Sequence, residues 1–201
     1  MSEWTRLLFV GVGGQGVLST GRWVGDAAVA HGLEVVVGQV HGLSQRGGSV
    51  QASVVLGGAR SWEIPDGMAD ALVALEPMEA ARALVKISKT TAVLANTRPV
   101  LPSSLQSLGR PYPPLSSLLG PVGEAAGSLS AVDATSLASQ AGSPRSLNVV
   151  MLGMLVGSGV LPFPGERLLE VVLAAGSAKL AGINRAAFGL GEEAVRWVRA
   201  T

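Results

Sequence analysis

The chain has 201 residues, enough for one sizeable hydrophobic core, and we expect a single domain spanning residues 1–201. Its 15 basic and 14 acidic residues leave a net charge of +1 and form no run of like charge, which argues against a nucleic-acid-binding surface. The sequence contains no cysteine, so this chain alone cannot hold a disulfide, a thiolate zinc site or a cysteine-ligated iron–sulfur cluster.

Two further features of the composition concern the surface and the location of the protein. Charged residues make up only 14% of the chain, whereas an ordinary soluble domain has roughly 25%. Either another chain covers part of the surface or the composition is biased overall, and composition alone leaves both interpretations open. The sequence has no signal-peptide pattern and no long uninterrupted apolar segment, so we expect a cytoplasmic protein that does not contact a membrane.

The first forty residues predict a strand, a helix and a second strand. Residues 6–10 are apolar and followed by glycine, which is typical of a buried strand. Apolar residues recur at helical spacing in residues 15–31, and Gly32 should end that helix. Residues 33–40 are apolar and β-branched, which indicates a second strand. The three elements together indicate a βαβ unit with a right-handed crossover.

The next segments predict a mixed sheet. Residues 49–56 partly alternate between polar and apolar side chains, as a strand does. A connection of only about eight residues from the preceding strand is too short for a helical crossover, so antiparallel pairing is expected. Further strands are predicted at residues 71–75 and 91–95, with a helix at residues 77–87 between them.

The second half of the chain begins with a proline-rich segment and then becomes mainly helical. Residues 101–127 contain five prolines, so we expect an irregular excursion over the surface there. Asn148 should cap one of the later helices, the alternative being a contact with a ligand. The fold class predicted is α/β, a doubly wound, Rossmann-like, mostly parallel mixed sheet with helices on both faces. The remaining elements predicted are a strand at residues 129–133 and helices at residues 134–140, 147–156, 165–179 and 192–199.

The first glycine-rich loop, GVGGQG at residues 11–16, follows a predicted strand and precedes a predicted helix. Glycines there permit positive φ angles and close backbone approach, and the following helix presents free N–H groups to an anion. NAD is disfavoured because no acidic residue ends the second strand, and a P-loop is excluded because no Gly-Lys-Ser/Thr follows. The alternative is that the glycines only allow a tight turn. The residues expected to contact a cofactor are Gly11, Gly13, Gly14, Gln15 and Gly16.

The second loop, HGLSQRGGS at residues 41–49, places several polar groups at the end of a strand, where open α/β sheets bind ligands. The Arg46 guanidinium can bind a carboxylate or phosphate, and Gln45 and His41 can orient polar groups. The alternatives are a His41 that secures the turn and an Arg46 in a surface ion pair or subunit contact. We expect His41, Gln45 and Arg46 to serve catalysis and Gly47, Gly48 and Ser49 to contact a cofactor, with no metal ligand among them.

The two loops together make the sequence resemble the gamma-type subunits of the 2-oxoacid:ferredoxin oxidoreductases, most of all the small (beta) subunits of indolepyruvate ferredoxin oxidoreductases. The segments that carry the likeness are GVGGQGVLSTGR at residues 11–22, VHGLSQRGGSV at 40–50, ADALVALEPMEAAR at 69–82, NTRPVLP at 96–102, NVVMLGMLVGSGVLP at 148–162 and NRAAFGLG at 184–191.

The resemblance implies a subunit of a thiamine diphosphate enzyme that oxidatively decarboxylates a 2-oxoacid such as indolepyruvate or pyruvate, makes an acyl-CoA and reduces ferredoxin. It implies that a larger partner subunit carries the thiamine diphosphate and the iron–sulfur clusters, that this chain binds no cofactor alone, and that both loops face coenzyme A or the substrate in a shared cleft. Alone the chain would be inactive and could form a homodimer. The alternative functions are a non-catalytic assembly module and a free nucleotide-binding protein.

Overall fold

The sheet of the computed structural model has six strands in the order β2-β3-β1-β4-β5-β6. The structure describes residues 4–41, 48–101 and 107–197, with the backbone alone for His41. Strands β1, β4, β5 and β6 are parallel, whereas β3 is antiparallel to both β1 and β2. The strands are β1 (Thr5–Val12), β2 (Val35–His41), β3 (Ser49–Leu56), β4 (Ala71–Ala74), β5 (Ala92–Asn96) and β6 (Ser128–Val132).

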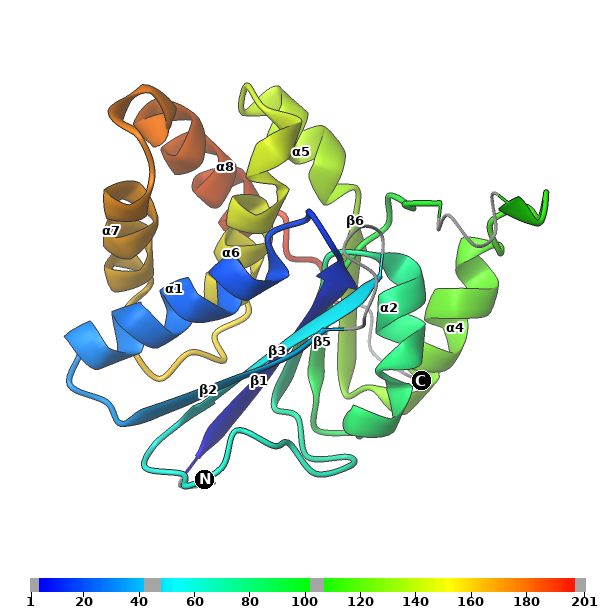
Figure 1. Ribbon diagram of the computed structural model, residues 1–201, viewed down its shortest axis with the longest axis horizontal. Coiled ribbons are helices and arrows are strands. Elements are labelled where there is room, and N and C mark those ends of the chain that lie inside the picture. Colours follow the sequence, from blue (N-terminus) through cyan, green and yellow to red (C-terminus); the bar gives the residue numbers. More distant parts are fainter. Residues whose placement is uncertain (1–3, 42–47, 102–106, 198–201) are drawn as a thin grey trace.

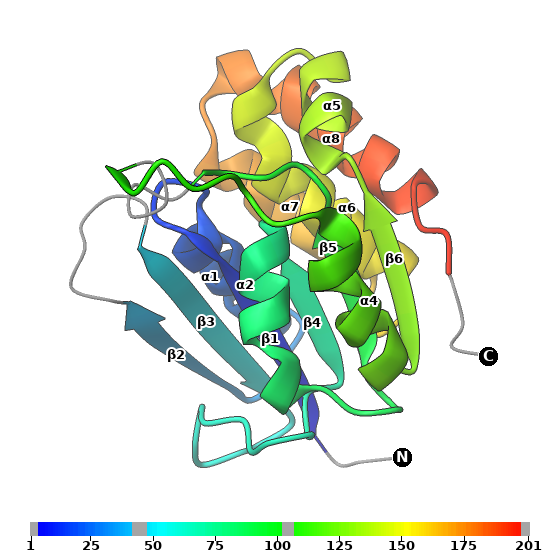
Figure 2. The same ribbon diagram turned by 90° about the vertical axis from the view of Figure 1, so that its right-hand side faces the viewer.

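Helices cover both faces of this sheet, so the predicted α/β class with a mostly parallel mixed sheet is confirmed (Figure 1). None of the described helices is long and apolar enough to cross a membrane. One face carries α1 (Val17–Ala30), α5 (Ala134–Gln140), α6 (Leu147–Gly157), α7 (Gly165–Ala175) and α8 (Ala181–Glu193), and the other carries α2 (Pro77–Arg82) and α4 (Leu115–Ala125) (Figure 2). Short 3-10 helices occupy Leu84–Lys86, Pro144–Ser146 and Ala178–Leu180.

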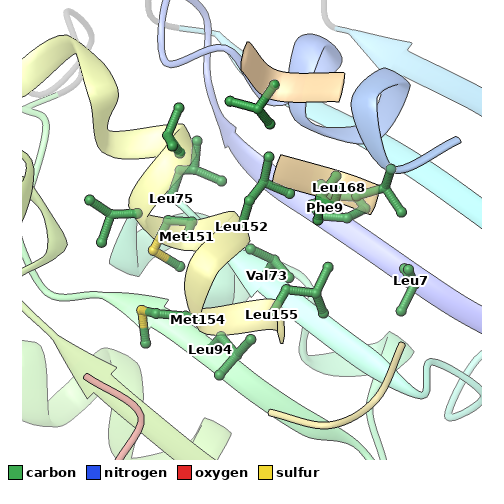
Figure 3. Packing of buried hydrophobic residues seen from close by; sticks show 14 of the residues in the cluster. Leu7, Phe9, Val73, Leu75, Leu94, Met151, Leu152, Met154, Leu155 and Leu168 are labelled. Carbon is green, nitrogen blue, oxygen red and sulfur yellow. The ribbon is translucent and has the colours of Figure 1, made fainter. Parts of the chain in front are cut away.

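The larger part of the core lies between the sheet and α6. Phe9 from β1 and Val73 from β4 face Leu152 and Leu155 of α6, with Leu168 of α7 beside them (Figure 3). The side chains of α6 are buried on all sides because the helix lies between the sheet and α8. This packing holds the N-terminus of α6 against the sheet edge that carries the first glycine loop.

Strand β3 has the predicted bounds and the predicted antiparallel pairing with β2. The predicted strand–helix–strand unit forms as β1, α1 and β2, with its two strands parallel, but β3 lies between them. Strand β3 lies between β1 and β2, so that Gln51 is opposite Val10 on one side and Val40 on the other. The first two strands are therefore not neighbours. A short connection lets β3 fold back beside β2, and its other edge then pairs with β1.

The proline-rich segment is more regular than its composition indicates. An irregular excursion was expected over residues 101–127, yet α4 (Leu115–Ala125) forms there with Pro121 inside it. Pro121 cannot donate a hydrogen bond to the carbonyl of Ser117, but both residues are exposed, so water can satisfy that carbonyl. The opposite side of the helix buries Leu119 and Val122 against the sheet.

The last helix is displaced from its predicted position at residues 192–199, because α8 spans Ala181–Glu193. Glycines within it hide the helical pattern, and they allow close packing instead. A Cβ atom on Gly191 would overlap the carbonyl oxygen of Val150 in α6. Close packing of α8 against α6 thus requires glycine at this position, although glycine has a low helix propensity. The helices predicted at residues 77–87 and 165–179 are also shorter, each ending before a short 3-10 helix.

Candidate functional site

The first glycine loop lies at the carboxyl edge of the parallel strands, beside Gly48 and Ser49 at the described end of the second loop (Figure 1). The N–H group of Gly13 donates to the carbonyl oxygen of Gly48 at 2.9 Å, and Val12 lies opposite Ser49 in the strand pairing. The expected proximity of the two loops is confirmed for their described ends. The expectation that they follow neighbouring strands is wrong, because β3 separates β1 from β2.

The first loop turns through left-handed backbone and leads into an open helix end. Gly14 and Gly16 have φ angles of 99° and 82°. A Cβ atom on Gly14 would meet nothing within 4 Å. Gly16 is the N-cap residue of α1, no side chain caps this helix, and its first turn contains no acidic residue. The N–H groups of the first turn, which have no partner within a helix, are therefore available to an anion.

Gln15 braces this loop from within the protein. Its Oε1 atom accepts a hydrogen bond from the N–H of Val12 at 2.9 Å, and its Nε2 atom donates to the carbonyl oxygen of Leu75 at 3.0 Å. Gly11 packs beneath it, since a Cβ atom there would lie 2.8 Å from Gln15 Oε1. Both residues therefore shape the loop, and contact of either with a cofactor stays a prediction.

A buried polar network continues from Gln15 along the same edge. The carbonyl oxygen of Leu75 also accepts a hydrogen bond from Asn96 Nδ2 at 3.0 Å. The Oδ1 atom of Asn96 accepts from the N–H of Ala134 at 3.1 Å. These bonds link the ends of β1, β4 and β5 to the start of α5. Satisfied buried networks of this kind hold a unique arrangement.

The start of β3 is tied to α2 through a buried carboxylate. Glu79, which is 2% exposed, accepts a hydrogen bond from Ser49 Oγ at 2.5 Å with one oxygen and from Arg82 at 2.5 Å with the other. Ser49 was expected to contact a cofactor, and its hydroxyl is engaged with Glu79. Sequence reasoning noted Glu79 only within a family motif, because its partner Ser49 is distant in the chain.

A second buried carboxylate closes the N-terminus of α2. Glu76 is 1% exposed and is the N-cap residue. Its Oε2 atom accepts from the N–H groups of Met78 at 2.7 Å and Glu79 at 3.1 Å, and its Oε1 atom accepts from the N–H of Val100 at 3.2 Å and the hydroxyl of Tyr112 at 2.5 Å. Burial and the adjacent Glu76 carboxylate raise the pKa of Tyr112 well above its usual value.

The residues expected to act in catalysis lie largely outside the described residues. The backbone of His41 pairs with Val50 at the end of β2. The side chain of His41 and all of Gln45, Arg46 and Gly47 lie outside the described part, so their roles stay predictions. Among the described residues, no three His, Asp or Glu side chains are arranged to hold a metal ion.

One described cavity lies far from this edge. It has a volume of about 430 Å³ and is found at the opposite end of the sheet, near the N-terminus of β1. The Arg6 guanidinium lies 5.2 Å from the centre of the Trp4 ring there. The loops therefore form a surface at the edge of the molecule, separate from this cavity. Its lining residues include Trp4, Arg6, Val55, Arg60 and Glu63.

Comparison with known proteins identifies the family. The family model described as pyruvate ferredoxin/flavodoxin oxidoreductase matches residues 6–194. The chain belongs to this family. The resemblance carried by the two loop motifs is thereby confirmed, and the family model covers both loops and all the strands.

Individual members of the pyruvate ferredoxin/flavodoxin oxidoreductase family agree with this assignment. The indolepyruvate oxidoreductase subunit IorB of Archaeoglobus fulgidus is 38% identical over 186 residues, which cover 92% of each chain. The keto/oxoacid ferredoxin oxidoreductase gamma subunit of Geobacter sulfurreducens has a TM-score of 0.68 and 23% identity, covering 94% of this chain and 96% of its own.

A larger protein contains the same fold as one part of its chain. The 2-oxoglutarate:ferredoxin oxidoreductase of Magnetococcus marinus, solved with 2-oxoglutarate, coenzyme A and succinyl-CoA bound, has a TM-score of 0.72 and 20% identity. The match covers 96% of this chain and 31% of that one. At these identities the two solved structures establish the shared fold.

One residue of the family-like motif at 148–162 differs from its prediction. Asn148 was expected to cap α6, but the N-cap residue is Ser146, and no side chain caps this helix. The Ser146 hydroxyl instead donates to Asn184 Oδ1 at 3.2 Å. The prediction failed because the helix begins one residue later than the serine and one residue before the asparagine.

Proposed function

We propose that this chain is the small, gamma-type subunit of a thiamine diphosphate-dependent 2-oxoacid:ferredoxin oxidoreductase. The complex oxidatively decarboxylates a 2-oxoacid, forms an acyl-CoA and reduces ferredoxin. A larger partner subunit carries the thiamine diphosphate and the iron–sulfur clusters, and this chain alone is inactive. The family match and the identity to subunit IorB support this assignment, and the lack of cysteine agrees with clusters held elsewhere.

In this proposal the glycine-loop edge forms the side of the cleft that faces coenzyme A or the 2-oxoacid. The observation that carries it is the Gly13 to Gly48 hydrogen bond, which holds the described end of the second loop beside the first loop and the uncapped N-terminus of α1. Backbone N–H groups there suit a phosphate or carboxylate. Arg46, in the second loop, would bind the same class of group through the N–H donors of its planar guanidinium.

The substrate class follows from the relatives, whose names specify indolepyruvate. We therefore expect the complex purified through this chain to contain a larger thiamine-binding subunit and to oxidise indolepyruvate in preference to pyruvate and 2-oxoglutarate. Turnover of each acid with coenzyme A and ferredoxin measures the preference. Purification of this chain without such a subunit would contradict the proposal.

Two variants of Gly14 test the anion-binding role of the loop. Gly14→Asp and Gly14→Asn have side chains of nearly equal size, and both occupy the same open, positive-φ position. Only the aspartate adds negative charge, which should weaken coenzyme A binding about tenfold relative to the asparagine variant. Calorimetric titration of the assembled complex measures the ratio, and equal affinities would exclude an anion at this loop.

A further inference from the structure

The cavity at the opposite end of the sheet from the glycine loops has a floor formed by β1 and β3. Arg6 of β1 lies directly opposite Val55 of β3 in the strand pairing. Side chains alternate between the two faces of a strand, so Arg6 lies on the same face as Leu8, which is buried on the side that α2 and α4 cover. Arg6 and Val55 therefore lie side by side on that face, at the end where β1 begins.

The connection between β3 and β4, rather than a helix, covers this floor. It crosses the end of the sheet at which the N-terminus lies (Figure 1). Ala59, Arg60, Glu63 and Pro65 of this connection line the cavity, together with Trp4 just before β1. The volume of about 430 Å³ is enough for a small organic molecule, since ligand sites begin at roughly 300 Å³.

The Arg6 guanidinium lines this cavity with most of its donors unused. Only 13% of its side chain is exposed, and the centre of the Trp4 ring lies 5.2 Å away. Its ion pair with Asp70 is long, because Nη1 lies 3.9 Å from an Oδ2 atom that already accepts the Arg6 N–H at 2.7 Å. Among the described residues, no side-chain nitrogen or oxygen is buried without a partner, so the unbonded Arg6 donors are open to the cavity.

A second guanidinium and one carboxylate complete the charged lining. Arg60 is exposed and forms no ion pair with any residue that the structure describes. Glu63 is also exposed, so water can satisfy its oxygens. Guanidinium groups bind carboxylates through paired N–H donors. Because Glu63 and Asp70 offset part of the positive charge, a ligand with one negative charge fits better than a phosphate with two.

We infer that this cavity is a binding site for a small organic carboxylate, whose oxygens accept from Arg6 and Arg60 while its apolar body lies against Val55, Ala59 and Pro65. The cavity is at the end where the parallel strand β1 begins, whereas open α/β sheets bind their substrates at the carboxyl ends of the strands. A carboxylate bound here leaves the glycine-loop edge free, so the inference does not depend on the proposed function.

Three ligands of similar shape and different charge test the site on the purified 201-residue chain. Phenylbutyrate carries a carboxylate, phenylbutanol a neutral hydroxyl and phenylbutylamine a positive charge. We expect the carboxylate to bind about tenfold more tightly than the alcohol, and the amine no more tightly than the alcohol. Isothermal titration calorimetry measures the three affinities. Equal affinities of the acid and the alcohol, or no saturable binding of the acid, would overturn the inference.

Variants of the two arginines assign the carboxylate to the cavity. Arg60→Ala should weaken binding of phenylbutyrate about threefold, and Arg6→Met, which keeps the stem and removes the donors, about tenfold. Neither should change the affinity for phenylbutanol, which reports whether the cavity remains intact. Arg145→Ala removes an exposed arginine at the other end of the sheet and should bind as the wild type does. Normal binding of the acid by both cavity variants would show that the inference is wrong.

Two further measurements separate this site from the glycine-loop edge. Excess coenzyme A should not displace phenylbutyrate, and Gly14→Asp should leave the affinity for phenylbutyrate unchanged. Displacement, or loss of affinity in the Gly14 variant, would place the carboxylate at the glycine loops and contradict the inference. If Gly14→Asp and Gly14→Asn bind coenzyme A equally while the arginine variants lose phenylbutyrate, the proposed role of the loop fails and the cavity site stands.

Discussion

The N-termini of α1 and α2 lie at the same edge of the sheet, after the neighbouring parallel strands β1 and β4, but they end in different ways. Helix α2 is closed by its own Glu76 carboxylate, which accepts two of the first N–H groups. Helix α1 begins at a glycine with no side-chain cap and no acidic residue in its first turn. One helix end is therefore internally neutralised and the other keeps its donors for a ligand.

Because of this difference, we expect substitutions at the two helix ends to change different quantities, namely the free energy of unfolding at α2 and the anion affinity at α1. Substitutions on the α2 side should lower the free energy of unfolding and leave anion affinity unchanged in the folded complex. Substitution of Gly14 by aspartate on the α1 side should do the reverse. The contrast fails if variants on the two sides affect both quantities alike.

The largest expected effect on stability is that of Glu76→Ala. The substitution leaves the N–H groups of Glu79 and Val100 and the hydroxyl of Tyr112 without their acceptor, and the N–H of Met78 keeps only the Tyr112 oxygen. Unpaired buried donors are costly, so we expect the free energy of unfolding to fall by about 3 kcal/mol. Urea denaturation measures it. The control Glu124→Ala changes an exposed glutamate and should cost less than about 0.5 kcal/mol.

Glu79→Gln should have a smaller effect. It removes the charge that pairs with Arg82, whose side chain is about half exposed, but it keeps an oxygen that can accept from Ser49. Because solvent screens the ion pair, we expect a loss of about 1 kcal/mol in the free energy of unfolding. A double-mutant cycle with Ser49→Ala measures how strongly the start of β3 depends on this carboxylate. Additive effects would show that the two residues are not coupled.

The sequence was sufficient for features that depend on local pattern. The six strands, α1 and the antiparallel pairing of β3 follow from short apolar runs, glycine boundaries and one short connection. It was insufficient for α8, because Gly191 serves close packing against α6 and weakens the helical pattern. It was also insufficient for α4, where exposure of Pro121 makes an interior proline tolerable.

The candidate site shows the same limit. The two loops could be recognised from their glycines and polar residues. Their proximity was expected from a pairing of the first two strands, whereas β3 lies between them and brings Gly48 to the first loop. The role of Glu76 could not be predicted, because Tyr112 and Val100 lie beside it only in the folded chain. Local pattern predicts a cap at Asn148 and none at Glu76, and only the contacts show that Glu76 caps α2 and that Asn148 does not cap α6.

The smallest expected effect is that of Tyr112→Phe, and pH makes it measurable. Because burial and Glu76 raise the pKa of Tyr112 in the folded state, the phenol keeps its proton while an unfolded tyrosine, with a pKa of about 10, loses it. The unfolded state then binds fewer protons, so the Tyr112 contribution to stability is complete below about pH 10 and declines above it. At neutral pH the variant should lose about 0.5 kcal/mol, and the difference from the wild type should shrink between roughly pH 10 and 11. A constant difference across that range would show that Tyr112 does not need its proton to remain beside Glu76. The N-terminus of α2 would then be stabilised by Glu76 and the backbone alone.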